Sequence, residues 1–397
     1  MTDSSRLPGA SPNRAYIRGV DHLRAGFALL VLFYHGLQLF SANLIHHAMF
    51  VPADWPRTRN PLLAVVIEGH TGVAAFMVLS GFIFVQGTLG RAINYREFLR
   101  NRLLRIYPLY LLLVIFGFCA TPTAFSLRNL VILVLPLGNF IIPPVGAFGA
   151  MAWAVAVEFQ FYLVFPLLLR LLEIRGDGLL ARMILVAAGL RLAAGLLGSN
   201  VHWMSYWSIA GRIDQFLLGM LAGAWYARRP TGSRARTWPA LGAGALVWAL
   251  LYGFHRLGGW PLHAWWKALW PDAEGGAWAL FIATYVGVSD RLPRAIGRPL
   301  EAIGRISFSI YLLHFIVVLI VDIHGWILRP FANPYSDALL TTAVIVLPIT
   351  LVCARFSYAT IEAPFLALRR RYATSMPMAP AAPADGLGAP SVIGTVE

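Results

Sequence analysis

The sequence contains ten apolar runs that are long enough, or nearly long enough, to cross a bilayer as helices. Hydrophobic residues make up 58% of the 397 residues and charged residues only 13%, which is more apolar than a soluble domain of this length needs to be. The pattern predicts an all-α polytopic membrane protein in which about ten transmembrane helices form one bundle. The expected spans are residues 23–42, 63–88, 106–122, 151–172, 179–198, 208–228, 238–255, 275–289, 302–324 and 338–362.

The 32 Lys and Arg residues test this arrangement, because short cytoplasmic loops of membrane proteins are enriched in them. With the N-terminus inside, ten spans place 23 of them in cytoplasmic segments, six in outer segments and three within spans. We therefore expect cytoplasmic N- and C-termini, and we attribute the net charge of +14 to topology rather than to nucleic-acid binding. The segment 128–146 contains Pro136, Pro143 and Pro144. We expect it to be interfacial or re-entrant, because an eleventh span would invert the segments after it and remove the excess of Lys and Arg on the cytoplasmic side.

The two ends of the chain differ in composition from the spans. Residues 1–17 form a polar leader rich in Pro and Ser, and residues 372–397 form a Pro/Ala/Gly-rich tail. We expect both to be disordered, leaving residues 18–371 as one transmembrane domain with no extramembrane domain after the last span. Cys119 and Cys353 offer neither a disulfide framework nor a metal site.

One histidine lies deep inside the first expected span. His35 follows Arg24 by eleven positions, which is about three helical turns and a rise of roughly 16 Å. Both side chains therefore lie on nearly the same helix face, Arg24 at the cytoplasmic end and His35 near the bilayer centre. An ionisable residue at that depth is costly and predicts a functional site.

Other polar residues are expected at a similar depth on three further helices. They are Ser80, Glu158, and the trio of Ser307, Tyr311 and His314, whose spacing of four and three places them on one helix face. Two imidazoles and a carboxylate could perform general acid–base chemistry on a hydroxyl, with His35 as base and Glu158 or His314 orienting it. The structural alternatives stay open: interhelical hydrogen bonds for the histidines, an ion pair for Glu158, and close helix packing for Ser80.

The basic segment 91–105 also has two interpretations. It could mark the cytoplasmic side and contact anionic lipid headgroups. Alternatively, Arg102 and Arg105, three positions apart just before a span, could bind the phosphates of a cytosolic donor. The sequence has no glycine-rich phosphate loop, no zinc spacing and no nucleophile elbow.

Six segments of the chain resemble the acyltransferase 3 family of membrane O-acyltransferases, in the family's order and near its spacing. They are GVDHLRAGFALLVLFYH, GVAAFMVLSGF, FLRNRLLRIYPLY, WAVAVEFQFYLVFP, ISFSIYLLHF and YATIEAPF. The resemblance covers residues 19–366. Two departures are a missing aromatic at Ala75 and missing hydroxyls at Ala154 and Ala156, where the family usually has serine before its carboxylate.

The resemblance implies a multi-pass protein of the cytoplasmic (inner) membrane. Its activity would be transfer of an acyl group, commonly acetyl, from acyl-CoA as co-substrate to a hydroxyl of a glycan, lipid-linked sugar or glycosylated small molecule. It matches the family's essential Arg–ten residues–His element to Arg24 and His35, its basic motif to Arg102 and Arg105, and its carboxylate to Glu158. Together with the common depth of the polar residues, this leads us to expect His35, Glu158 and His314 as catalytic residues. We expect Arg24, Arg102, Arg105, Ser80 and Tyr311 to bind acyl-CoA, with no metal and no permanently bound cofactor.

Three matters stay open from the sequence. The chain lacks the periplasmic hydrolase-like domain of some relatives, so it would transfer the group directly or through a separate periplasmic partner. The acyl group could also pass through a covalent acyl-histidine. A proton-coupled transporter or flippase, and a non-catalytic scaffold of a polysaccharide assembly complex, are the alternative functions.

Overall fold

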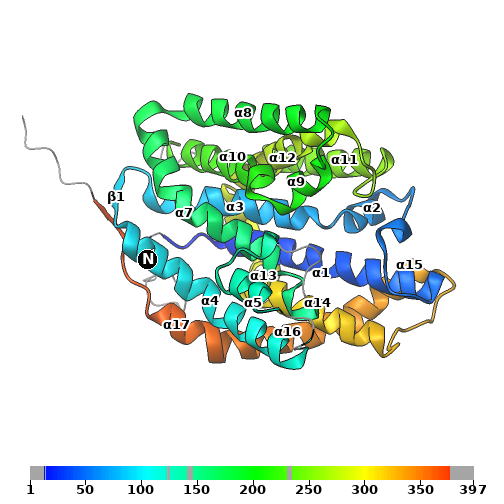
Figure 1. The fold of residues 1–397 in the computed structure, drawn as a ribbon. Coiled ribbons are helices and arrows are strands. Elements are labelled where there is room, and N and C mark those ends of the chain that lie inside the picture. The colour runs from blue at the N-terminus through cyan, green and yellow to red at the C-terminus, as the bar shows by residue number, and fades with distance from the viewer. Residues whose placement is uncertain are drawn as a thin grey trace, which may run out of the picture.

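The computed structural model describes residues 13, 15–121, 123, 126–140, 146–229 and 235–375. Within them the chain is almost entirely helical (Figure 1). The α-helices are α1 (Arg18–His46), α2 (Pro61–Ile67), α3 (Thr71–Thr88), α4 (Tyr95–Ala120), α5 (Leu127–Val134), α6 (Gly146–Gly149), α7 (Ala152–Arg175), α8 (Asp177–Leu196), α9 (Val201–Trp207), α10 (Ile209–Ala227), α11 (Trp238–Arg256), α12 (Trp270–Val286), α13 (Arg294–Arg305), α14 (Ser307–Ile323), α15 (Pro334–Thr341), α16 (Leu347–Ser357) and α17 (Ala363–Ala367).

Shorter elements connect these helices. Four are 3₁₀ turns and two are π-helical turns inside the last long helical stretch: η2 (Pro52–Asp54), η4 (Gly138–Phe140), η5 (Trp265–Ala268), η6 (Ser289–Arg291), π-helical η7 (Thr342–Val346) and π-helical η8 (Tyr358–Glu362). Strands β1 (Arg91–Ile93) and β2 (Ala373–Ser375) form a two-stranded antiparallel sheet.

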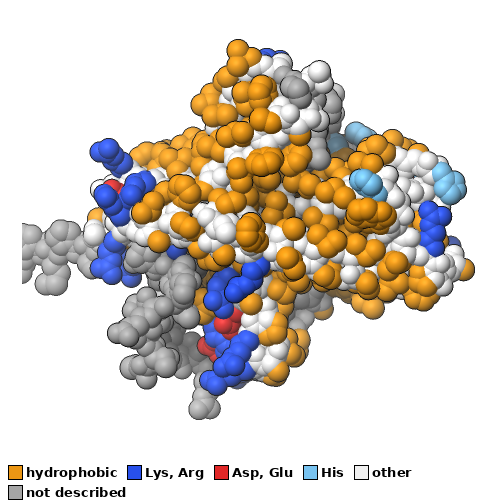
Figure 2. Space-filling view, turned by 90° about the horizontal axis from the view of Figure 1, so that it is seen from below, with side chains coloured by type: hydrophobic (Ala, Val, Ile, Leu, Met, Phe, Trp, Pro, Cys, Tyr) orange, Lys and Arg blue, Asp and Glu red, His pale blue; other side chains and the backbone are white. Residues whose placement is uncertain are grey.

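The prediction of an all-α membrane protein is confirmed at the level of fold class. Six described helices are long and apolar enough to cross a membrane, or seven if the pair α13 and α14 counts as one span. The expected spans at 208–228, 238–255 and 275–289 fall on α10, α11 and α12, which are not among those six. The count of ten spans and the cytoplasmic termini therefore stay predictions. Figure 2 shows hydrophobic side chains covering most of one face, with Lys and Arg in groups toward its left and lower edges.

Two expected spans differ from the structure. The span 63–88 is broken between α2 and α3, and the span 302–324 is bent by 73° between α13 and α14. The described part of segment 128–146 contains most of the eight-residue α5 and the turn η4, which agrees with not counting this segment as an eleventh span. The predicted disorder of residues 1–17 and 372–397 falls mostly outside the described residues, but Ala373–Ser375 form strand β2, so the ordered part of the chain extends beyond residue 371.

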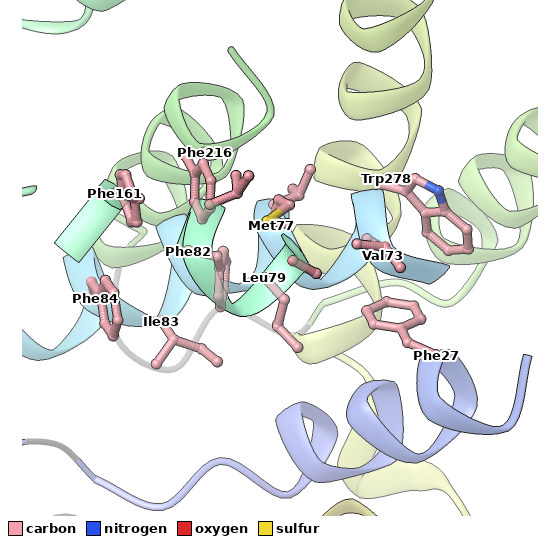
Figure 3. Packing of buried hydrophobic residues seen from close by; sticks show 14 of the residues in the cluster. Phe27, Val73, Met77, Leu79, Phe82, Ile83, Phe84, Phe161, Phe216 and Trp278 are labelled. Atoms are coloured by element: carbon pink, nitrogen blue, oxygen red, sulfur yellow. The ribbon is translucent and has the colours of Figure 1, made fainter. Parts of the chain in front are cut away.

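The core gathers around α3, which is buried along most of its length. Figure 3 shows its apolar side chains between those of neighbouring helices. Phe161 and Phe216 stack at 3.9 Å between ring centroids, and Phe27 meets Trp278 edge to face at 5.1 Å. This packing holds α1, α3, α7, α10 and α12 together.

Glycines allow α3 and α10 to approach very closely. A Cβ atom on Gly219 would collide with the carbonyl oxygen of Val78, and one on Gly81 with that of Phe216. Small residues at helix crossings are a usual means of close packing in membrane proteins. Since α3 also carries Ser80, this crossing fixes one wall of the candidate site.

Candidate active site

A cavity of about 720 Å³ is lined by residues along most of α3, by the first halves of α1, α4, α7 and α14, and by the segment that follows α17. Its wall includes six of the eight residues that the sequence marked: Arg24, Ser80, Arg102, Arg105, Glu158 and Tyr311. The structure therefore brings together side chains that lie up to 287 positions apart, as the expected common depth implied.

Positive charge dominates the cavity. Seven arginines and three acidic residues line it: Arg24, Arg91, Arg102, Arg105, Arg305, Arg369 and Arg371, against Asp21, Glu158 and Glu301. Outside the spans, burial and then the nearby charges of Arg105 and Arg102 lower the pKa of Arg369 to about 10. An excess of guanidinium groups in a partly buried space favours an anionic ligand.

Arg102 lies in a cage of aromatic rings. Its guanidinium carbon is 4.8 Å from the ring centroid of Phe84, 5.4 Å from Phe98, and 5.8 Å from both Tyr162 and Tyr372. Its Nε atom is buried without a hydrogen-bond partner, and no acidic residue in the described part of the chain lies within ion-pair distance of it. The cage thus positions a cation that has no carboxylate partner among the described residues.

Arg105, in contrast, is paired. Its Nη1 lies 3.5 Å from Oε2 of Glu362, a fully buried residue that also accepts a hydrogen bond from Ser309. Arg24 is likewise paired, with Asp21 at 3.3 Å. Both arginines therefore have a structural partner in addition to the cavity they face.

Glu158 pairs with Ser80 rather than with a histidine. The Ser80 hydroxyl donates to Oε1 of Glu158 at 3.0 Å, across from α3 to α7. Among the described contacts, none joins Glu158 to His35 or His314. Of the two residues that the sequence offered for orienting His35, the described contacts therefore join His314 to it, while Glu158 pairs with Ser80.

His35 and His314 form a direct pair between α1 and α14. Nδ1 of His35 lies 2.9 Å from Nε2 of His314, whose own Nδ1 lies 3.0 Å from the carbonyl oxygen of Ile310. A carbonyl only accepts, so for two neutral rings His314 carries its proton on Nδ1 and accepts at Nε2. His35 must then donate from Nδ1, which leaves its Nε2 lone pair available as a base.

The two histidines differ in access. His314 is completely buried, whereas His35 is partly exposed. Neither is among the described residues that line the arginine-rich cavity, but Tyr311 lines it, and its ring centroid is 5.9 Å from that of His314. Tyr311 therefore borders both the cavity and the histidine pair, and its buried hydroxyl has no hydrogen-bond partner among the described residues.

Comparison with known proteins decides the family. A family model described as an acyltransferase domain matches residues 17–356. The chain belongs to the acyltransferase 3 family. It is also 26% identical over 313 residues to acyltransferase MdmB of Streptomyces mycarofaciens, an alignment that covers 71% of this chain and 76% of the relative. No solved structure matches the chain. The predicted family and the predicted acyltransferase activity are thereby confirmed.

The site of this acyltransferase includes residues that the sequence did not single out. Glu362 lies in one of the family-like segments, and its signal was an acidic residue in an apolar run. Arg369 and Arg371 were counted only as topological charges. Tyr16 lies at the cavity wall, where burial and then the charge of Asp21 raise the pKa of its hydroxyl.

A second polar cluster of the acyltransferase lies beyond His35 and was also missed. Glu68 is fully buried and contacts His70 at 3.0 Å and His255 at 2.9 Å. The ring of Tyr34 lies between them and the histidine pair, 5.9 Å from His70 and 4.7 Å from His35 between centroids. Residues 68–70 are the break between α2 and α3, so a charged interior site explains why the expected span is interrupted.

Proposed function

We propose that this protein transfers an acyl group, acetyl in the first instance, from acyl-CoA to a hydroxyl group of a glycan, lipid-linked sugar or glycosylated small molecule. The reaction would take place within the cytoplasmic membrane. The observation that carries the proposal is that Tyr311 lines an arginine-rich cavity, suited to a phosphorylated donor, and lies beside the histidine pair.

In this proposal His35 is the general base. Its Nε2 takes the proton of the acceptor hydroxyl, and the oxygen attacks the thioester carbonyl. The carbon–sulfur bond then breaks, the CoA sulfur leaves as a thiolate, and this thiolate takes the proton from Nε2 of His35. His314 holds the His35 ring in the tautomer that has Nε2 free. The partial exposure of His35, against complete burial of His314, supports this division of roles.

The remaining cavity residues would bind the donor. Arg102 offers a cation without a carboxylate partner among the described residues, and Glu158 with Ser80 offers hydrogen-bonding groups for the amides of the pantetheine arm. Tyr311 would lie beside the thioester end. Arg24 and Arg105 would add positive charge while keeping their ion pairs with Asp21 and Glu362.

A labelling experiment tests the proposal. Membranes that contain the protein are incubated with acetyl-CoA radiolabelled in the acetyl group, and label is measured in glycan, lipid and small-molecule fractions. We expect label in a hydroxyl ester with wild-type protein and with His324→Ala, an exposed histidine at the end of α14. We expect none with His35→Ala. Equal labelling by all three would contradict the role of His35.

A further inference from the structure

The chain beyond the last helix is tied back to the cavity mouth. Strand β2 pairs antiparallel with β1 in the register Arg91 with Ser375, Ala92 with Thr374 and Ile93 with Ala373. In Figure 1 this sheet lies beside the beginning of α4, at the end of the molecule where α17 finishes. The segment 369–372 between α17 and β2 is therefore held across the cavity at both of its ends.

Two buried asparagines fix the backbone of this segment. Asn101 of α4 donates to the carbonyl of Arg370 at 2.6 Å and accepts from its amide at 3.0 Å. Asn13 donates to the same carbonyl at 3.2 Å and accepts from the amides of Tyr372 at 2.7 Å and Ala373 at 3.2 Å. Buried side-chain amides with this many backbone partners hold one backbone conformation.

This backbone sends adjacent arginines in different directions. Arg369 and Arg371 line the cavity. Arg370, between them, is not among the lining residues; its side chain is 66% exposed and its Nη1 lies 3.6 Å from Glu97. The segment thus contributes Arg369 and Arg371 to the seven arginines that line the cavity, and Arg370 is not part of the lining.

Tyr372 completes the aromatic cage at the same place. Its side chain is buried, meets Phe98 edge to face at 5.2 Å, and lies 5.8 Å from the guanidinium of Arg102. Arg102 of α4 and the segment's Arg369 and Arg371 therefore line the same cavity, and the charge of Arg102 acts on Arg369.

We infer that Arg369 and Arg371, held by Asn13, Asn101 and the β1–β2 pair, bind the phosphate groups of the CoA nucleotide together with Arg102. The inference rests on the proposed function, because it assigns the nucleotide end of the same donor. Guanidinium groups bind phosphate oxygens through two parallel hydrogen bonds, and the seven arginines that line the cavity outnumber its three acidic residues.

Equilibrium titration of CoA into the purified full-length protein in detergent tests the inference. Arg369→Gln and Arg371→Gln should each raise the Kd for CoA by about 10-fold or more, the usual effect of losing a charge-assisted hydrogen bond to phosphate. Arg370→Gln is the matched control, with the same charge change one position away, and should alter the Kd by less than about twofold. Inorganic pyrophosphate should compete with CoA on the wild type.

Salt provides a second measurement on the same proteins. Binding of CoA to the wild type should weaken as NaCl rises, and the dependence should be shallower in Arg371→Gln because one phosphate contact is gone. Wild-type affinity in both Arg369→Gln and Arg371→Gln, or an equal loss in Arg370→Gln, would overturn the inference and leave the proposed donor intact. Failure of the wild type to bind CoA would instead overturn the proposed donor and this inference together.

Discussion

Nδ1 of His35 and Nε2 of His314 lie 2.9 Å apart, and His314 is itself tied to the carbonyl of Ile310. The chain of hydrogen bonds runs from the backbone of α14 to a ring on α1. It gives His314 a positioning role that follows from the acceptor-only chemistry of a carbonyl. We therefore expect substitutions of His314 and His35 to have different effects on the rate of acetyl transfer.

Substitution of His314 should slow turnover without weakening donor binding. We expect His314→Ala to lower kcat for acetyl transfer by about 10- to 1,000-fold, within the range of general base catalysis that depends on an oriented ring. The KM for acetyl-CoA should change by less than about threefold. His314→Gln keeps an acceptor atom and should recover part of the rate. A raised KM with normal kcat would assign His314 to binding instead.

Glu158 should behave as a binding residue, because its partner is Ser80 and not a histidine. Glu158→Gln is expected to raise the KM for acetyl-CoA by about 10-fold, the cost of one hydrogen bond to a charged group, and to change kcat by less than about threefold. Ser80→Ala should have a smaller effect in the same direction. If steady-state kinetics of Glu158→Gln showed a lower kcat and an unchanged KM, Glu158 would have a catalytic role instead.

The pair of Arg105 and Glu362 should contribute to stability as well as to the cavity. Arg105→Gln leaves a fully buried carboxylate with Ser309 as its remaining partner among the described residues, so we expect a loss of about 1–3 kcal/mol in the free energy of unfolding. Glu362→Gln in the Arg105→Gln background should recover part of it. Thermal unfolding in detergent measures both, and additive losses in the double variant would contradict the pairing.

The crossing of α3 and α10 should not tolerate a methyl group. Gly219→Ala would push a Cβ against the backbone of Val78, which cannot move without separating the helices. We expect a loss of about 1–3 kcal/mol or more in stability. Gly242→Ala on α11 is the control, because nothing lies within 4 Å of its Cβ position. Equal melting temperatures for the two variants would show that the crossing is looser than described.

Hydropathy located the helices but not their ends. The first span was expected over residues 23–42, while α1 runs from Arg18 to His46, because a helix continues through its polar ends once the apolar centre has formed. The break at Glu68 could not be predicted for another reason. One of its partners, His255, is 187 positions away, and no local pattern records such a contact.

For the candidate site, the sequence predicted which polar residues lie at a similar depth but not which of them are in contact. Helical periodicity and depth put His35 and His314 near each other, and the structure places them in contact. Depth alone also suggested Glu158 as their partner, but rotation of α7 about its axis decides which neighbour a side chain meets, and Glu158 meets Ser80. Arg369 and Arg371 were beyond prediction, since their place depends on a strand pairing between residues 91–93 and 373–375.

The most direct test of the account is the transfer of labelled acetyl from acetyl-CoA by His35→Ala, with CoA binding measured on the same preparation. The account predicts loss of at least about 100-fold in transfer, the contribution expected of a general base, with CoA affinity within about twofold of wild type because His35 lies outside the arginine-rich cavity. Transfer at the wild-type rate by a folded His35→Ala protein would contradict it.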